Sequence, residues 1–191
     1  NIYDALQTLL KELIKIEGNR LMKIKQLTTS DAKELQEISI ETFTATFSSQ
    51  NDMNDLNQYL EESYSIDKLT KEIENTDSTF YIFYDDNNEK MSYLKLNIDS
   101  AQSEDDFDNA LEIERIYIQK HHQKKGLGRQ MFNLALKKAS ELNKRQIWLG
   151  VWEFNENAKL FYTHLGFEVA GEHTFNLGSD AQTDLLMSRK I

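Results

Sequence analysis

The chain has 191 residues, no cysteine and a formal charge of −10, from 22 Lys and Arg against 32 Asp and Glu. This length suits one domain with a substantial core. The lack of cysteine excludes disulfides, thiolate metal sites and a cysteine nucleophile, and the histidines form no H-E-x-x-H zinc motif. The negative charge argues against nucleic acid or an anionic membrane as a partner and favours a cationic small molecule or protein tail.

Residues 1–21 are expected to be an extension that precedes a main domain at 22–191. The apolar residues of this extension recur at helical spacing, at Ile2, Leu6, Leu9, Leu13 and Ile16. This pattern predicts an amphipathic helix. Two alternatives stay open: the segment lies upstream of a natural start at Met22, or it packs as an extra helix on the domain or a neighbour. In the second case it would support a homo-oligomer.

The first half of the main domain is predicted to hold a strand, three helices and a hairpin. In chain order these are a strand from Met22, helices to about residue 47, over about 52–63 and from Ser65, and hairpin strands at 79–84 and 91–98. Thr28 and Asp31 have the spacing of a capping box at the start of the first helix. Aromatic and β-branched residues mark the strands.

The second half alternates strands and helices. It comprises an acidic loop at 99–110, strands at 111–118 and 146–152, helices at 126–142 and 155–165, and final strands at 167–175 and 183–188. In the strand at 111–118, simple alternation would place Ile113, Arg115 and Tyr117 on one face, opposite Glu112 and Glu114. The whole order predicts an α/β fold, with a mixed central sheet of about six to seven strands flanked by helices.

The most informative segment is the glycine-rich stretch that joins the strand at 111–118 to the following helix. Its sequence is Gln123-Lys124-Lys125-Gly126-Leu127-Gly128-Arg129. Glycines let backbone N–H groups turn toward an anion, and a helix N-terminus adds partial positive charge. The stretch is neither a Walker loop nor a dinucleotide fingerprint. The residues alone therefore indicate either a phosphate site or a tight turn with solvated lysines.

Two motifs of this chain resemble the GNAT acetyltransferase superfamily. Residues 123–128 match its acetyl-CoA motif Q/R-x-x-G-x-G/A, and residues 155–167 match its Asn-x-x-Ala helix that runs into Tyr and then Gly-Phe. The likeness extends to PaiA-type spermidine/spermine N-acetyltransferases over most of the main domain, in the stretches 40–47, 97–103, 111–118, 147–153 and 182–187. The resemblance implies a GNAT fold and acetyl transfer to an amine.

The resemblance also implies acetyl-CoA as the cofactor, coenzyme A as a product, and no metal. In this fold the strands at 111–118 and 146–152 splay apart, and the pantetheine arm lies between them. The residues that would hold the cofactor are Ile116, Tyr117, Ile118, Gln123, Lys124, Lys125, Gly126, Leu127, Gly128, Arg129 and Asn155.

Acetyl transfer to an amine needs a proton acceptor and a proton donor. A polyamine nitrogen titrates near lysine, at a pKa of about 10.4, so a carboxylate that accepts its proton is expected. Glu112, eleven positions before Gln123, matches the family's glutamate base, with Glu114 or a water chain as the alternative. Tyr162 matches the family's general acid; the alternative is that it is a core tyrosine.

The acceptor that the resemblance implies is a polyamine such as spermidine or spermine. Carboxylates and aromatic faces would bind it, and the candidates are Glu41, Asp99, Trp152, Glu153 and Asp184. The alternatives are a peptide or protein amine, or a regulatory module that binds acetyl-CoA without turnover. His173 is interpreted as structural, and His121 and His122 are expected in solvent. The lack of cysteine and of targeting signals is compatible with the cytoplasm.

Overall fold

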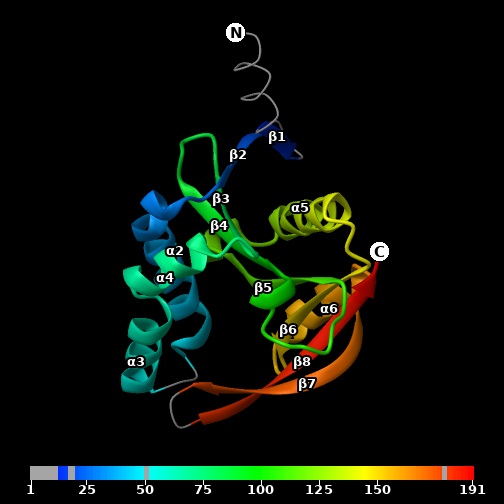
Figure 1. Cartoon of the computed structure of the whole chain (residues 1–191). Helices are drawn as coiled ribbons and strands as arrows, with labels where there is room; N and C mark the ends of the chain where they lie inside the picture. The colour runs from blue at the N-terminus through cyan, green and yellow to red at the C-terminus, as the bar shows by residue number, and fades with distance from the viewer. Residues whose placement is uncertain (1–12, 17–19, 50–51, 178–179) are drawn as a thin grey trace.

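A central β-sheet with helices on both faces organises the chain (Figure 1). The computed structural model describes residues 13–16, 20–49, 52–177 and 180–191. Its strands are β1 (Leu13–Ile16), β2 (Arg20–Gln26), β3 (Ser78–Tyr84), β4 (Lys90–Ile98), β5 (Ala110–Ile118), β6 (Gln146–Trp152), β7 (Glu168–Leu177) and β8 (Asp180–Lys190). Its α-helices are α2 (Ala32–Phe47), α3 (Met53–Ser63), α4 (Ile66–Glu74), α5 (Leu127–Glu141) and α6 (Glu156–His164). Short 3-10 turns lie at η1 (Thr29–Asp31), η2 (Asp99–Ala101) and η3 (Lys120–His122).

The eight strands of the described residues lie in the order β1-β2-β3-β4-β5-β6-β8-β7. Every neighbouring pair is antiparallel except β5 with β6, which run parallel. A parallel pair requires a crossover connection, and α5 supplies it. The expected α/β fold with a mixed sheet is therefore confirmed.

Strand β3 shows why both faces of the sheet are covered. Phe80, Ile82 and Tyr84 pack in one apolar layer with α2, α3 and α4. Tyr81 and Phe83 pack in the other layer, with α5 and α6. Because side chains alternate along a strand, a strand buried on both faces is apolar throughout its length. Figure 1 shows the two groups of helices on opposite sides of the sheet.

The expected helix over residues 1–16 is wrong at its C-terminal end. Leu13–Ile16 is strand β1, which pairs antiparallel with β2 from Leu13 opposite Lys23 to Ile16 opposite Arg20. The partner strand begins at Arg20, before the expected opening at Met22. The spacing of apolar residues in a short segment carries no information on the hydrogen bonds that a neighbouring strand can form with it. Isoleucine, moreover, is enriched in strands. The rest of the predicted helix, 1–12, lies outside the described residues.

A β-bulge in β5 changes which side chains face each layer. The pairing with β4 shifts between Lys95 and Leu96, so that Glu114 is the extra residue. Ile113 consequently packs in the layer of α5, whereas Tyr117 packs in the opposite layer. The expected alternation, with these two residues on one face, is wrong because a bulge reverses the phase of the strand.

The parallel pairing of β5 with β6 is short. It joins residues 110–112 to residues 146–148, and no further pair between these strands is recorded in the described ranges. Beyond it β5 runs on to Ile118, while β6 runs on to Trp152 and pairs only with β8. The two strands therefore part toward their C-terminal ends, as the family resemblance implies.

One histidine expected in solvent is buried. His121 is exposed, but His122 is only 7% exposed. The backbone N–H of His122 donates to the Gln119 carbonyl at 2.8 Å. Burial, together with the positive charges of His121 and Lys125, lowers the pKa of His122. The tight turn of η3 directs one ring inward and leaves its neighbour outside, a difference that two adjacent identical residues do not reveal.

Candidate active site

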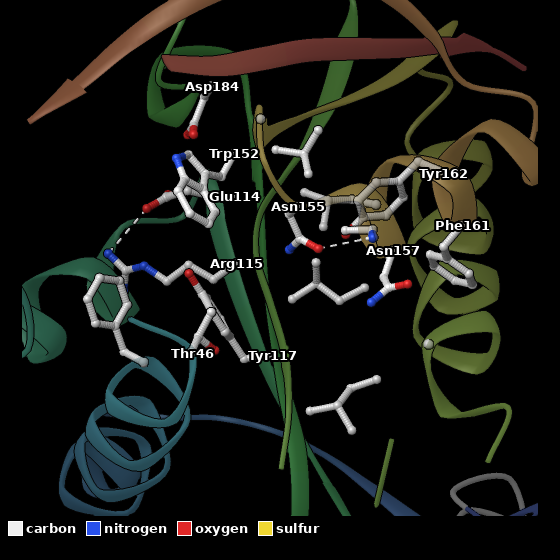
Figure 2. Close-up of a pocket in the computed structure, with 18 of the residues that line it drawn as sticks. Thr46, Glu114, Arg115, Tyr117, Trp152, Asn155, Asn157, Phe161, Tyr162 and Asp184 are labelled. Carbon is white, nitrogen blue, oxygen red and sulfur yellow. Dashed lines mark hydrogen bonds and ion pairs between the residues drawn. The ribbon is translucent and has the colours of Figure 1, made fainter. Parts of the chain in front are cut away.

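A cavity of about 900 Å³ opens where β5 and β6 part. Its walls come from α2, α3, β5, α5, β6, α6, β7 and β8 and from the loops beside them. Figure 2 shows Asn155 and Tyr162 on one side of the cavity, with Trp152 and Asp184 on the other. The cavity therefore joins the predicted cofactor elements to residues proposed for the acceptor.

The glycine-rich stretch leads into α5 through two left-handed residues. Lys124 has φ +59° and Gly126 has φ +81°, and Gly126 is the N-cap of α5. The first-turn N–H groups of a helix have no acceptor within the helix. At the start of α5, which lines the cavity, these groups are available to bind an anion. A Cβ on Gly128 would lie 3.2 Å from Cζ of Phe161. Close packing of α6 therefore keeps that position small.

Every predicted cofactor residue except Lys125 lines the cavity. These residues are Ile116, Tyr117, Ile118, Gln123, Lys124, Gly126, Leu127, Gly128, Arg129 and Asn155. Gln123 Nε2 donates to the Ile118 carbonyl at 3.1 Å, which ties the loop to the end of β5. The residues Lys124 and Arg129 are exposed at this end of the cavity, whereas Lys125 is exposed outside it. Oxygen-bearing anions such as a pyrophosphate fit this combination of backbone donors and cations.

Asn155 is the N-cap of α6, and its side-chain amide uses the oxygen for the cap. Its Oδ1 accepts the Ala158 N–H at 3.1 Å, as an N-cap does (Figure 2). Its Nδ2 makes no hydrogen bond recorded within the described ranges. Lys159 fixes the same turn through the Glu153 carbonyl and, at 2.7 Å, the Glu156 carboxylate. The cap therefore leaves one amide donor for a ligand in the cavity.

Tyr162 is both a core side chain and a cavity residue. It is 7% exposed, and its ring meets Phe161 and Phe167 edge-on at centroid distances of 5.4 and 5.8 Å. Burial raises the pKa of the Tyr162 hydroxyl above its ordinary value. The hydroxyl therefore stays protonated at neutral pH, which is the state a proton donor needs.

Glu112 lines the cavity and has both carboxylate oxygens hydrogen bonded. Oε1 accepts from Ser103 Oγ at 2.5 Å, and Oε2 accepts from the Ser103 N–H at 2.9 Å and from Asn97 Nδ2 at 3.0 Å. Burial raises the pKa of Glu112 and outweighs these hydrogen bonds, which act to lower it. The result is a carboxyl group with increased proton affinity.

Glu114 belongs to a partly buried ion-pair network. Its carboxylate lies 2.5 Å from Lys95 Nζ and 3.2 Å from Arg115 Nη2. Both cations also pair with Glu72, at 3.1 and 2.9 Å. Burial acts to raise the pKa of Glu114, but Arg115 and Lys95 outweigh it and hold that pKa below its usual value. Of the two glutamates, Glu112 has the environment better suited to accepting a proton.

Three of the five predicted acceptor residues lie outside the cavity. Glu41 Oε2 accepts from Gln119 Nε2 at 2.9 Å, and Asp99 pairs with Lys144 at 2.5 Å. Glu153 does not line the cavity either; its N–H donates to the Thr183 carbonyl of β8 at 3.0 Å, and its carbonyl accepts from Lys159. Sequence likeness placed these residues in the right stretches but did not show which side of the chain they face.

The other two, Trp152 and Asp184, line the cavity. Burial raises the pKa of Asp184, and His173 acts against that shift. The structure adds two wall residues that sequence reasoning missed or treated as structural: Glu104, from the acidic loop, and His173, whose Nδ1 lies 2.6 Å from Glu104 Oε1. The acidity of the loop was the only signal for Glu104.

The described residues contain neither a membrane-spanning helix nor a cluster of metal ligands. None of the helices there is both long enough and apolar enough to cross a membrane. No group of three or more His, Asp or Glu residues there is arranged to hold a metal ion.

Comparison with known proteins agrees with this geometry. An uncharacterized N-acetyltransferase in the pepI 3' region of Lactobacillus delbrueckii subsp. lactis is 45% identical over 170 residues, 89% of this chain and 98% of that protein. A probable spermine N(1)-acetyltransferase of Bacillus subtilis subsp. natto is 36% identical over 74 residues, 38% of this chain and 49% of that protein. A crystal structure of a PaiA N-acetyltransferase from Thermoplasma acidophilum, in complex with coenzyme A, has a TM-score of 0.72 at 22% identity, covering 89% of this chain and 99% of that chain.

The match to a family profile covers most of the main domain. The Acetyltransferase (GNAT) family matches residues 34–167, which include both the glycine-rich stretch and the α6 motif. In the structure, the glycine-rich stretch forms the turn that begins α5, and the second motif forms the capped helix α6. Both lie beside the point where β5 and β6 part. The chain therefore belongs to the GNAT family of acetyltransferases.

Proposed function

We propose that this protein transfers an acetyl group from acetyl-CoA to a primary amine, and that the amine is a polyamine such as spermidine or spermine. The observation that carries the proposal is one continuous cavity that opens between β5 and β6. One end carries backbone N–H groups and cations, and the other carries carboxylates and aromatic rings. The anionic pyrophosphate of acetyl-CoA would bind at the first end, and the cationic acceptor amine would bind at the second.

The residues at the end with the backbone N–H groups and cations fit the pyrophosphate and pantetheine of coenzyme A. The N-terminus of α5, with Lys124 and Arg129 beside it, would bind the pyrophosphate. The free backbone groups of β5 beyond its pairing with β6 would hydrogen bond the pantetheine arm, and Asn155 Nδ2 would add one donor. The cofactor supplies an activated acetyl thioester.

The proton transfers are assigned to two side chains that line the cavity. A polyamine nitrogen has a pKa of about 10.4, roughly three units above pH 7, so forming the neutral amine at that pH costs about 4 to 5 kcal/mol. Glu112 accepts that proton, directly or through water, because burial raises its proton affinity. Tyr162 gives its proton to the departing thiolate, and a β5 backbone N–H stabilises the carbonyl oxygen as charge develops on it.

The choice of a polyamine rests on the acceptor end of the cavity. Trp152 packs near Phe47, with ring centroids 6.4 Å apart, and Asp184 lies in the same wall. Aromatic faces and carboxylates together bind alkylammonium groups. The partial likeness to a probable spermine N(1)-acetyltransferase supports the same choice. A lysine side chain or a protein N-terminus offers one amine in place of several, and it is the second candidate class.

The test is thiol release from acetyl-CoA with a panel of acceptors. The panel comprises spermidine, spermine, a lysine peptide, an N-terminal peptide and a no-acceptor control. We expect release that depends on the polyamines. Release with peptides alone would retain the mechanism and overturn the polyamine assignment. Measurable acetyl-CoA binding with no release for any acceptor would favour a regulatory acetyl-CoA-binding module.

A further inference from the structure

We propose that Glu104 and Asp184 form a subsite for a second positive charge on the acceptor, and that His173 occupies this subsite as an internal competitor. The proposal rests on the proposed function, because it assumes an amine acceptor. It adds a reason for preferring an acceptor with two ammonium groups over one with a single amine.

The three residues come from separate parts of the chain and meet at one wall of the cavity. His173 in β7 lies directly opposite Asp184 in β8 in the sheet register. Glu104 reaches the same place from the loop after η2, and its Oε1 lies 2.6 Å from His173 Nδ1. All three line the cavity. The His173 ring therefore contacts Glu104 and lies on the same face of the sheet as its cross-strand neighbour Asp184.

The other carboxylates of the cavity wall are already compensated. Glu112 accepts hydrogen bonds from Ser103 and Asn97. Glu114 is paired with Lys95 and Arg115. Glu114 is neutralised by these cations, and Glu112 is assigned to the amine that reacts, so neither is available to a second ammonium group.

Glu104 and Asp184 are different. Asp184 has no hydrogen bond or ion pair recorded in the described part of the chain, and Glu104 has a recorded ion pair only with His173 there. Asp184 therefore has no partner of its own there, and Glu104 is paired only with a half-exposed imidazole. A second ammonium group that enters the cavity would be attracted to these two carboxylates.

The surroundings favour an alkylammonium ion. The Asp184 carboxylate lies over Gly150 of β6, where a Cβ would be in ordinary contact with Asp184 Oδ2, at 3.5 Å. Trp152 and Tyr59 line the same cavity and offer aromatic faces to a cation. Figure 2 shows Asp184 and Trp152 together on one side of the cavity.

His173 is placed to yield to a substrate. Its side chain is 47% exposed, whereas that of Glu104 is 21% exposed. The imidazole satisfies Glu104 through one ring nitrogen, whereas an ammonium group offers three N–H donors and a full charge. The half-exposed ring can turn toward solvent while the more sheltered carboxylate stays in place. An ammonium group would thus replace the imidazole rather than add to it.

The experiment compares diamines with monoamines of matched chain length. Acetyl transfer to a series of α,ω-diamines and the corresponding n-alkylamines is measured with wild type and with E104Q, D184N, H173A and H173K. We expect E104Q and D184N to raise KM for the best diamine by about tenfold, and to raise KM for the monoamine by a clearly smaller factor. H173A should lower KM for the diamine, because the competitor is gone, and H173K should raise it.

Several results would overturn the subsite. Equal effects on diamine and monoamine would show that neither carboxylate reads the second charge. Loss of kcat with both amines in D184N would instead place Asp184 in proton transfer. Circular dichroism checks that each variant is folded. If no amine is acetylated, the proposed function fails, and calorimetric titration of the diamine and monoamine decides the subsite. Weaker diamine binding in both carboxylate variants would support it, and equal binding would exclude it.

Discussion

Ser103 binds both oxygens of the Glu112 carboxylate, through its hydroxyl at 2.5 Å and its backbone N–H at 2.9 Å. The two residues come from the loop after β4 and from β5. Because Ser103 lies in the same loop as Glu104, one short segment both holds the proposed base and contributes to the proposed acceptor subsite.

Ser103→Ala should move the acid limb of the pH–rate profile to higher pH. The hydroxyl stabilises the ionised carboxylate, so its loss raises the pKa of Glu112 further above the ordinary carboxyl value. A base acts in its ionised form, and activity at low pH therefore falls. The measurement is kcat/KM against pH. Ser100→Ala is the control, since the Ser100 hydroxyl donates to Asp77 at 2.7 Å. An unmoved limb would show that Glu112 does not control it.

Tyr162→Phe should lower kcat while leaving the fold intact. The ring contacts with Phe161 and Phe167 survive the substitution, and only the hydroxyl is lost. Loss of a general acid lowers turnover by about 10²- to 10⁴-fold. The loss should be smaller for a thioester with a more acidic thiol, which leaves without a proton. Tyr81→Phe, at another buried tyrosine, serves as the control. Full activity in Tyr162→Phe at every pH would leave Tyr162 only its core role.

Gly128→Glu should weaken acetyl-CoA binding by about tenfold or more, because it places a carboxylate where an anion is expected to bind. The new side chain also meets Phe161, which lies 3.2 Å from the position of a Cβ. Calorimetry with coenzyme A measures the Kd, and circular dichroism checks that α5 still forms. Unchanged affinity in a folded variant would contradict the assignment of this loop.

Lys124→Ala and Lys125→Ala form a matched pair. Both lysines are exposed neighbours in one loop, but only Lys124 lines the cavity. We expect Lys124→Ala to raise the Kd for coenzyme A more than Lys125→Ala does, and the difference to shrink in high salt. Equal increases in the Kd would mean that both lysines act only through the overall positive charge of the loop, and that neither contacts coenzyme A directly.

Lys95→Met should destabilise the protein strongly. The Lys95 side chain is 7% exposed and pairs with Glu72 and Glu114. Removing one partner of a buried ion pair costs about 3–5 kcal/mol, because the remaining charge is left uncompensated. Urea unfolding measures the change. Lys90→Met is the control, because its pair with Glu37 is exposed and should contribute little. A small change for Lys95→Met would show that Arg115 alone compensates Glu114.

Much of this protein could be predicted from local pattern. A run of aromatic and β-branched residues predicts β3. The spacing of Thr28 and Asp31 predicts a helix start, and their capping box begins η1, which leads into α2; there the Thr28 N–H donates to Asp31 Oδ2 at 2.9 Å. Gly126 and Gly166 both adopt positive φ next to a helix. These features depend on a few consecutive residues, so the sequence alone determines them.

The tertiary structure decided what depends on distant partners. Strand β1 forms because β2 offers it hydrogen bonds, and the bulge at Glu114 reverses the phase of β5. The same holds for the acceptor wall, where Glu104 and His173 meet although 69 positions separate them in the chain. The sequence by itself determined most of the elements after residue 22, the two motifs and through them the family. Only the packed structure decided which carboxylates stay uncompensated, because charge compensation depends on neighbours that folding brings together.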